Sequence, residues 1–246
     1  MYLETIFCAE DIQKQLPVES QKFVVVDKMW KTIMKSTNDA PKVIGSIDEG
    51  PQLLQQFQQA NMTLESVQKS LEDYLETKRM AFPRFYFLSN DELLEILSQT
   101  RDPHAVQPHM QKCFDAIKSI EFGTAREAKK IFGFKDPGGE KVAMTQAAEA
   151  EGAVEHWLTN VQFCMRKALY DNSATAWEKY PKDRDGQINR GEWLFGYPAQ
   201  VIIMIDQVYW TGGLGGAIRA VEAGENAADA AAIENFLDFS LQQINA

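Results

Sequence analysis

The sequence predicts a mainly α fold, an elongated helical-bundle arm with a small β-hairpin-containing insertion in its middle. Apolar residues recur at three- and four-residue steps along most of the chain, which is typical of amphipathic helices. Between residues 120 and 144 this period is lost, and short apolar runs alternate with glycine and proline. The chain has 246 residues, of which 45% are hydrophobic, so it can bury a core without disulfides or metals.

Residues 1–120 are expected to form a helical subdomain built around one long helix. A short helix opens near 9–12 and ends before Pro17, because proline disfavours helical backbone in the residue before it. Pro17 can begin a second helix, and 37–50 then forms a connection. A heptad-like stripe follows, whose members step alternately by four and three residues: Leu53, Phe57, Ala60, Leu64, Val67, Leu71 and Tyr74.

This stripe predicts a helix over about 51–80. At about 1.5 Å per residue the helix is about 45 Å long, which is also about the diameter of a compact globule of this chain length. One helix would therefore run the whole width of a compact fold, so an elongated body is favoured. The stripe is compatible with a coiled coil to a partner, as in a stand-alone scaffold, or with packing against neighbouring helices, and we favour the second.

Several shorter elements are expected after the long helix. The aromatic run 84–88 is typical of a strand. Ser89 and Glu92 match a capping box, which predicts the start of a helix there. A further helix is expected over 108–119, with these residues on its apolar face: Met110, Cys113, Phe114 and Ile117.

Residues 121–146 are expected to hold short strands and a possible joint. The candidate strands are 120–122, 131–134 and 141–144, and Pro137-Gly138-Gly139 forms a hairpin turn between the last two.

Residues 147–246 are expected to form a C-terminal helical subdomain. Helices are predicted over 152–170 and 193–210 and in the alanine-rich tail after Gly224. A flexible turn between helices is the favoured interpretation of the glycine cluster 212–216.

Charge and cysteine usage exclude several classes of protein. The formal net charge is −10, which gives no general attraction to nucleic acid or anionic lipid. The apolar run 201–205 is stopped by Asp206, so no membrane-spanning segment and no membrane partner are expected. Three widely spaced cysteines, without a C-x-x-C pair, fit a reducing compartment.

The sequence assigns no catalytic and no cofactor-binding residue. It contains neither a Walker phosphate loop nor a G-x-S-x-G elbow. His104 and His109 are five residues apart and separated by proline, so they do not share the helical face of a metal site. An enzyme active site within this chain is not expected.

One motif supports an alternative function, a calcium-responsive helical regulator. Residues 181–192 match much of an EF-hand loop, with Gly186 at its sixth position. The first position falls on Pro181, which has no side-chain oxygen, so the loop is incomplete. The candidate calcium ligands are Asp183, Asp185, Gln187 and Glu192.

Long strings in the chain resemble dynein heavy chains. The longest is FPRFYFLSNDELLEIL at 82–97. Further matching strings are DYLE at 73–76, VQPH at 106–109, KCF at 112–114, GEKV at 139–142, YPAQV at 197–201 and YWT at 209–211. The chain is therefore identified as a member of this family, and the sequences of 88–90 and 102–109 are similar to those of axonemal, inner-arm types.

The resemblance implies that the segment is the linker preceding the AAA+ ring, a mostly helical arm whose C-terminal subdomain leads toward the first AAA+ module. ATP hydrolysis in the ring would bend and straighten this arm and so drive microtubule-based movement. ATP and Mg would bind elsewhere in the parent chain, a microtubule-motor ATPase, and the segment itself would not be an enzyme.

The resemblance also implies the partners. The arm would contact the AAA+ ring of the same heavy chain, meet other dynein subunits through the parent complex, and reach microtubules only through the parent's stalk. The expected location is the cytoplasm and cytoskeleton, with the axoneme of a cilium or flagellum for the axonemal type. Because the chain begins and ends within these patterns, we expect it to be part of a larger protein.

Overall fold

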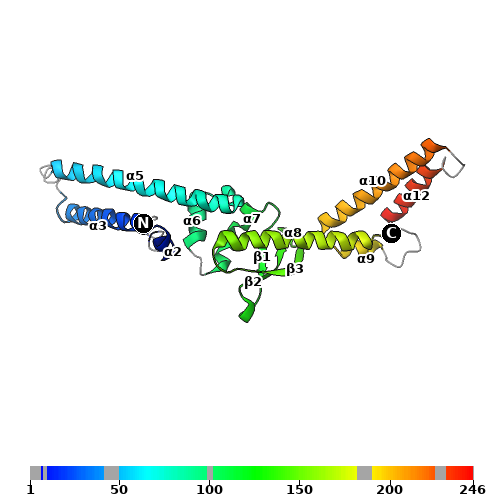
Figure 1. Ribbon diagram of the computed structural model, residues 1–246, viewed down its shortest axis with the longest axis horizontal. Coiled ribbons are helices and arrows are strands. Elements are labelled where there is room, and N and C mark those ends of the chain that lie inside the picture. Colours follow the sequence, from blue (N-terminus) through cyan, green and yellow to red (C-terminus); the bar gives the residue numbers. More distant parts are fainter. Residues whose placement is uncertain are drawn as a thin grey trace.

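The computed structural model describes residues 7, 10–41, 50–98, 102–181, 190–224 and 231–245. Its elements lie along an extended arm rather than around one centre, as Figure 1 shows. In chain order they are α2 (Glu10–Gln15), α3 (Pro17–Asp39), α5 (Gly50–Ala81), η1 (Pro83–Phe87), α6 (Asn90–Ser98), η2 (Pro103–His109), α7 (Met110–Cys113), β1 (Ser119–Phe122), η3 (Ala125–Glu127), β2 (Lys130–Lys135), β3 (Lys141–Glu149), α8 (Val154–Glu178), α9 (Arg190–Phe195), α10 (Ala199–Ala223) and α12 (Ala232–Asn245).

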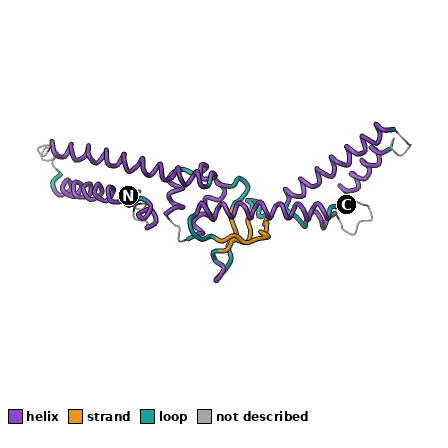
Figure 2. The backbone as a smooth tube through the Cα atoms, in the orientation of Figure 1, coloured by secondary structure: helices purple, strands orange, loops and turns teal. Residues whose placement is uncertain are grey.

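Helices dominate the arm, and the strands lie in its middle beside α8 (Figure 2). The predicted fold class, mainly α and elongated with a small β insertion, is confirmed.

At one end of the arm, α3 and α5 form an antiparallel helical hairpin (Figure 1). The seven residues of the heptad-like stripe are all buried or partly buried on α5. Trp30 of α3 lies against Phe57 of α5, with 6.2 Å between ring centroids. The long helix is confirmed, and its stripe packs within the chain as favoured. Residues 42–49 of the expected connection lie outside the described residues.

The strand predicted over 84–88 is wrong, because this run forms a 3-10 turn, η1. Arg79 at the end of α5 donates a hydrogen bond of 3.5 Å to the carbonyl oxygen of Phe85. The turn brings Phe82 and Phe85, three residues apart, into the core with ring centroids 5.0 Å apart. Residues three apart therefore share the buried face here, whereas in a strand every second residue would share it.

The helix predicted over 108–119 is much shorter in the structure, since α7 ends at Cys113. Phe114 then takes extended backbone, with φ −137° and ψ 111°. The amide of Lys118 donates to the carbonyl of Lys135 at 2.9 Å and thereby joins the sheet. Pairing with β2 competes with the helix for these backbone groups.

The sheet is antiparallel, with strand order β1-β2-β3, and it packs against α8. Lys135 pairs with Lys141 across the turn, where Gly139 has φ +99°, a conformation that favours glycine. The predicted hairpin is confirmed. β3 runs on to Glu149, past the predicted end at 144, because Ala148 pairs with Ile131 and both are buried.

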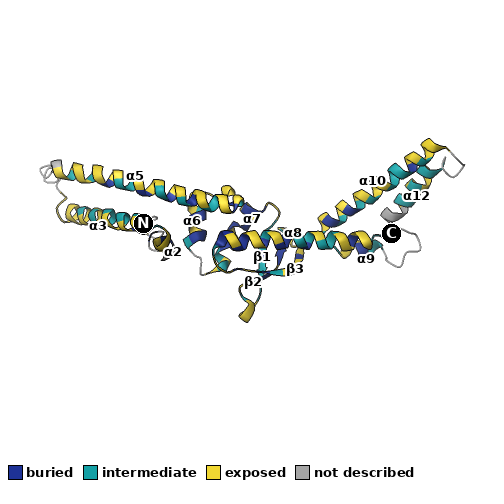
Figure 3. Cartoon of the chain, in the orientation of Figure 1, coloured by how far each residue is buried: buried dark blue, intermediate teal, exposed yellow. Residues whose placement is uncertain are grey.

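Buried residues gather in the centre of the arm, where α5, α6, the sheet and α8 meet (Figure 3). A second, smaller cluster joins α8 to the C-terminal helices and consists of Ala176, Trp193, Val201 and Ile205. The two tips are largely exposed (Figure 3).

The C-terminal helices differ from prediction in two ways. The helix expected over 193–210 is split, because α9 ends at Phe195 and α10 begins after Pro198. The turn expected at 212–216 is absent, since α10 continues through these glycines. A Cβ added to Gly213 would lie 2.4 Å from the Phe236 ring, so glycine here permits close approach of α12 rather than a bend.

By length and composition, α10 is apolar enough to cross a membrane, with a mean hydropathy of 1.2 over its best window. The apolar run 201–205 does not by itself predict so apolar a helix, because polar residues such as Asp206 interrupt the apolar sequence of α10. Helices in the cores of soluble proteins have the same composition but are mostly buried, whereas only 17% of this window of α10 is buried, although the helix packs against α8 and α12. The expectation of no membrane partner stays a prediction.

Candidate functional site

The structure locates only part of the predicted calcium site. Asp183, Asp185 and Gln187 lie outside the described residues, and Glu192 is exposed on α9. Across the part of the chain that the structure describes, no three His, Cys, Asp or Glu side chains gather as a metal site. The calcium alternative gains no support from this arrangement.

The expected absence of catalytic residues also stays a prediction. His104 and Cys113 have structural environments. The ring of His104 lies 4.2 Å from that of Phe122. Cys113 is buried, and burial raises the pKa of its thiol to about 11. A thiol with so high a pKa holds little thiolate near neutral pH, so it is a poor nucleophile.

The long helices meet at two junctions, α5–α8 and α8–α10, and polar and aromatic side chains gather at both. At the α5–α8 junction, Nζ of Lys78 lies 2.5 Å from Oε1 of Glu155. The two side chains are only 16% and 6% exposed. The other carboxylate oxygen of Glu155 is buried and accepts no hydrogen bond from the described residues. Separating a charge pair removed from water in this way would leave a buried charge without its partner, so the pair disfavours movement of the two helices apart.

An arginine strengthens the same junction. Arg84 of η1 donates to the side chain of Gln162 on α8 and to the carbonyl oxygen of Cys113, each at 2.9 Å. Its guanidinium also lies over the ring of Phe114, 4.5 Å from the centroid. Three elements therefore converge on one side chain, and the α5–α8 junction is cross-linked by both charge and packing.

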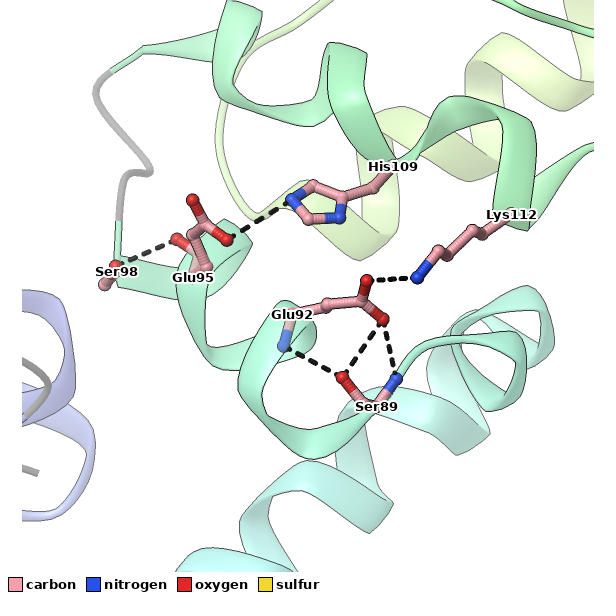
Figure 4. Close-up of polar contacts among 6 residues, drawn as sticks. All are labelled: Ser89, Glu92, Glu95, Ser98, His109 and Lys112. Atoms are coloured by element: carbon pink, nitrogen blue, oxygen red, sulfur yellow. Dashed lines mark hydrogen bonds and ion pairs between the residues drawn. The ribbon is translucent and has the colours of Figure 1, made fainter. Parts of the chain in front are cut away.

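The start of α6 is fixed by the predicted capping box, which Figure 4 shows. The amide of Ser89 donates to Oε2 of Glu92 at 3.1 Å, and the amide of Glu92 donates to Oγ of Ser89 at 3.3 Å. Lys112 of α7 pairs with the other oxygen of Glu92. The hydrogen bond from Lys112, with that from the Ser89 amide, lowers the pKa of Glu92 from 4.5 to about 2.

A second contact in Figure 4 joins α6 to η2. Nε2 of His109, which is buried, lies 3.6 Å from a carboxylate oxygen of Glu95. Ser98 closes the end of α6 by donating to the carbonyl oxygen of Glu95 at 2.8 Å. These polar contacts fasten α6 to the segment that leads into the sheet.

The α8–α10 junction is built differently, from aromatic rings and a partly exposed ion pair. Arg190 of α9 bonds Asp206 of α10 at 2.6 Å, and the Tyr180 hydroxyl donates to Asp206 at 3.0 Å. Tyr180 stacks on Tyr209 with 3.9 Å between centroids. The indole of Trp193 donates to the backbone at the end of α8 at 3.0 Å. Burial raises the pKa of the Tyr180 phenol, which stays a neutral donor.

Sequence reasoning missed both junctions. The partners Lys78 and Glu155 are separated by 77 residues, so no local pattern links them. The aromatic residues around the α8–α10 junction carry a weaker signal, their density between 177 and 210, that could have indicated a packing centre.

The structure is thus an elongated, mainly helical arm whose long helices are joined at two junctions. The family described as "Dynein heavy chain, N-terminal region 2" matches residues 1–176 of the chain. The chain belongs to this family.

Curated relatives agree with this family. Dynein axonemal heavy chain 6 of Homo sapiens is 40% identical over 263 aligned residues, which cover 100% of this chain and 6% of that protein. Dynein axonemal heavy chain 12 of Homo sapiens is 42% identical over 86% of this chain and 7% of its own length. Dynein axonemal heavy chain 1 of Mus musculus is 43% identical over 86% and 5% respectively.

These relatives confirm the dynein heavy chain resemblance and its axonemal character. At the level of the family, the chain is similar to heavy chains of axonemal dyneins. It spans about 6% of the length of the axonemal heavy chain 6 that it matches. The narrower inner-arm type stays a prediction.

Proposed function

We propose that this chain is the mechanical linker of an axonemal dynein heavy chain. Its bending and straightening across the AAA+ ring would turn ATP hydrolysis elsewhere in the parent chain into microtubule-based movement. The observation that carries the proposal is the α5–α8 junction, where a buried ion pair at 2.5 Å joins two long helices of an elongated arm. A lever needs stiff stretches of this kind.

The division of labour along the arm follows the predicted units. Residues 1–120 and 147–246 are the helical subdomains, and 121–146 is a candidate joint between them, where bending would require the Lys78–Glu155 pair that connects the subdomains to open. The C-terminal subdomain leads toward the first AAA+ module. The packing of α8 against β3 supports a coupling between the sheet and the second subdomain.

In this proposal the chain binds no nucleotide itself. ATP and Mg belong to the ring of the parent ATPase, and microtubules are reached through the parent's stalk. The immediate partner is the ring of the same heavy chain, and other dynein subunits are met through the parent complex. The protein acts in the cytoskeleton, in the axoneme of a cilium or flagellum.

A fluorescence energy-transfer experiment in the parent heavy chain tests the proposal. A donor at Lys35 on exposed α3 and an acceptor on the AAA+ ring report the position of the arm. We expect transfer to differ between the nucleotide-free and ATP-bound states, because the lever would change shape. Equal transfer in every nucleotide state, with ATP hydrolysis intact, would contradict a lever function.

A further inference from the structure

The N-terminus of α10 has no cap of its own. Pro198 stands at the N-cap position, and its side chain has no oxygen that could accept a hydrogen bond. The first backbone N–H groups of a helix have no partner inside the helix, and they carry a partial positive charge. Some other group must satisfy them.

The β2–β3 hairpin supplies that group. Oε1 of Glu140 accepts a hydrogen bond of 2.8 Å from the backbone amide of Ala199, the first residue of α10. The two residues are 59 positions apart. A carboxylate at this position bonds an orphan N–H and complements the helix dipole at the same time.

The hairpin turn holds Glu140 in place for this contact. The amide of Glu140 donates to Oδ1 of Asp136 at 2.6 Å, and the amide of Asp136 donates to the carbonyl of Glu140 at 3.1 Å. The amide of Gly139 also donates to the carbonyl of Asp136, at 3.3 Å. Three hydrogen bonds that involve Asp136 therefore fix the backbone from which the Glu140 side chain extends.

Around this bond the two surfaces are not closely packed. An open cleft of about 480 Å³ lies between the start of β3 and the segment 195–198. Phe195 in that segment is 93% exposed. The hydrogen bond from Ala199 to Glu140 therefore bridges two parts of the chain that touch loosely elsewhere.

The contacts on α10 explain why this bond matters for geometry. The Tyr180–Arg190–Asp206 cluster grips α10 at Asp206, about two turns along from Ala199. Buried Val201 and Ile205 and the Tyr180–Tyr209 stack hold α10 against α8 along the same stretch. Glu140 adds a contact at the first residue of α10, from the hairpin, and so restrains the direction in which α10 leaves these contacts.

We propose that Glu140 is a latch that sets the angle between α8 and the α10–α12 hairpin. When the latch is bonded to Ala199, the hairpin holds one direction. When it opens, α10 and α12 swing together at 196–198. The inference deepens the proposed lever function and rests on it for its mechanical meaning, because it names a releasable joint within the arm.

Electron-spin distance measurements on this 246-residue chain test the latch. Spin labels on non-natural amino acids at Tyr170 of α8 and Glu222 of α10, both exposed, avoid the native cysteines. We expect one dominant distance in the parent sequence. In Glu140→Ala the ratio of the latched to the unlatched population should fall roughly two- to fivefold, the range expected for one charge at a helix N-terminus.

A second variant removes the donor instead of the acceptor. Ala199→Pro deletes the N–H group at a helical position where proline is well tolerated, so it should release the latch without unfolding α10. The double variant with Glu140→Ala should behave like either single variant, since both remove one bond. The matched control is Glu149→Ala, which removes an exposed carboxylate from β3, the strand that follows Glu140, and should leave the distance unchanged.

The proposal is overturned if both single variants keep the parent distance distribution while remaining helical by circular dichroism. Independent effects of the two variants would also overturn it. The measurement reports on the joint alone, so it can fail while the arm still moves on the ring. Conversely, a working latch in an arm that ignores nucleotide would contradict the lever function only.

Discussion

Lys78 and Glu155 form a charge pair that is almost completely removed from water. Replacing Lys78 with methionine leaves the carboxylate buried with no cation beside it. We expect Lys78→Met to lower the free energy of unfolding by about 3–5 kcal/mol, measured by urea denaturation.

The control for this prediction is a more accessible pair of a lysine and an acid. Lys167 and Asp171 lie one helical turn apart on α8 at 3.0 Å, so Lys167→Met should change stability by at most about 0.5 kcal/mol. Replacing both buried partners, Lys78→Met with Glu155→Leu, should recover much of the loss. If Lys78→Met costs no more than the control, the pair does not hold the junction.

Glu92 makes the stability of α6 depend on pH. Its folded pKa is about 2, below its ordinary value of 4.5, so its ionised form favours the folded state. The contribution is complete above about pH 4.5 and is lost as the pH falls toward about 2. We expect unfolding midpoints measured in urea to fall over this window, and to fall less in Glu92→Gln. An unchanged pH profile in Glu92→Gln would show that the Lys112 contact is not responsible.

At the residue scale, the sequence could predict only contacts between near neighbours. Ser89 and Glu92 are three residues apart, so the capping box was visible as a pattern and was confirmed. The partners of Lys78 and Glu140 depend on how distant elements meet, and no pattern of residue types encodes that distance. Long-range polar contacts are therefore found in the structure alone.

At the scale of one element, neighbouring glycines in α10 have opposite roles. Gly212 has open space where a Cβ would lie, whereas Gly213 faces the ring of Phe236. We expect Gly212→Ala to stabilise the protein by about 0.5–1 kcal/mol through helix propensity. Gly213→Ala should lose that gain, because Phe236 must move away from α10.

Hydrogen exchange distinguishes the two variants. Amides of α12 should exchange faster in Gly213→Ala, since α12 packs through Phe236, and should be unchanged in Gly212→Ala. Equal protection of α12 in both variants would mean that the close approach at Gly213 contributes nothing to its packing.

Helical periodicity predicted the long elements well and their interruptions poorly. The apolar stripe of α5 extends over many residues, so single residues that do not fit the pattern did not obscure the helix. The glycines at 212–216 predict a turn because glycine lowers helix propensity, but packing against α12 overrides that preference. For 84–88, the bond from Arg79 to the Phe85 carbonyl favours a 3-10 turn over the strand expected from aromatic content.

At the scale of the whole molecule, the arm has a simple signature in solution. A compact globule of this length has a radius of gyration of about 18 Å. We expect small-angle scattering from the chain to give a clearly larger value, which added ATP does not change. A value near that of a globule would contradict the extended arrangement.

The elongated form could be predicted because one helix alone was as long as a globule is wide. The order of elements along the arm could not, since it depends on which faces pack together. The contribution of the sheet was equally hidden. Its three strands are short in sequence, yet Ile131 and Ala148 become part of the central core.

The chain turns back on itself near both tips. From its centre it runs outward along α3 and returns along α5, and α12 folds back along α10 toward α9 (Figure 1). The first and last described helices therefore both lie inward of the tips, and α2 contacts α6. A pull applied through α2 can pass to the central body through its contacts with α6, whereas a pull applied through α12 must pass through α10, against which α12 packs. The tip formed by α3 and α5 would then carry little tension and stay free to touch a neighbouring surface.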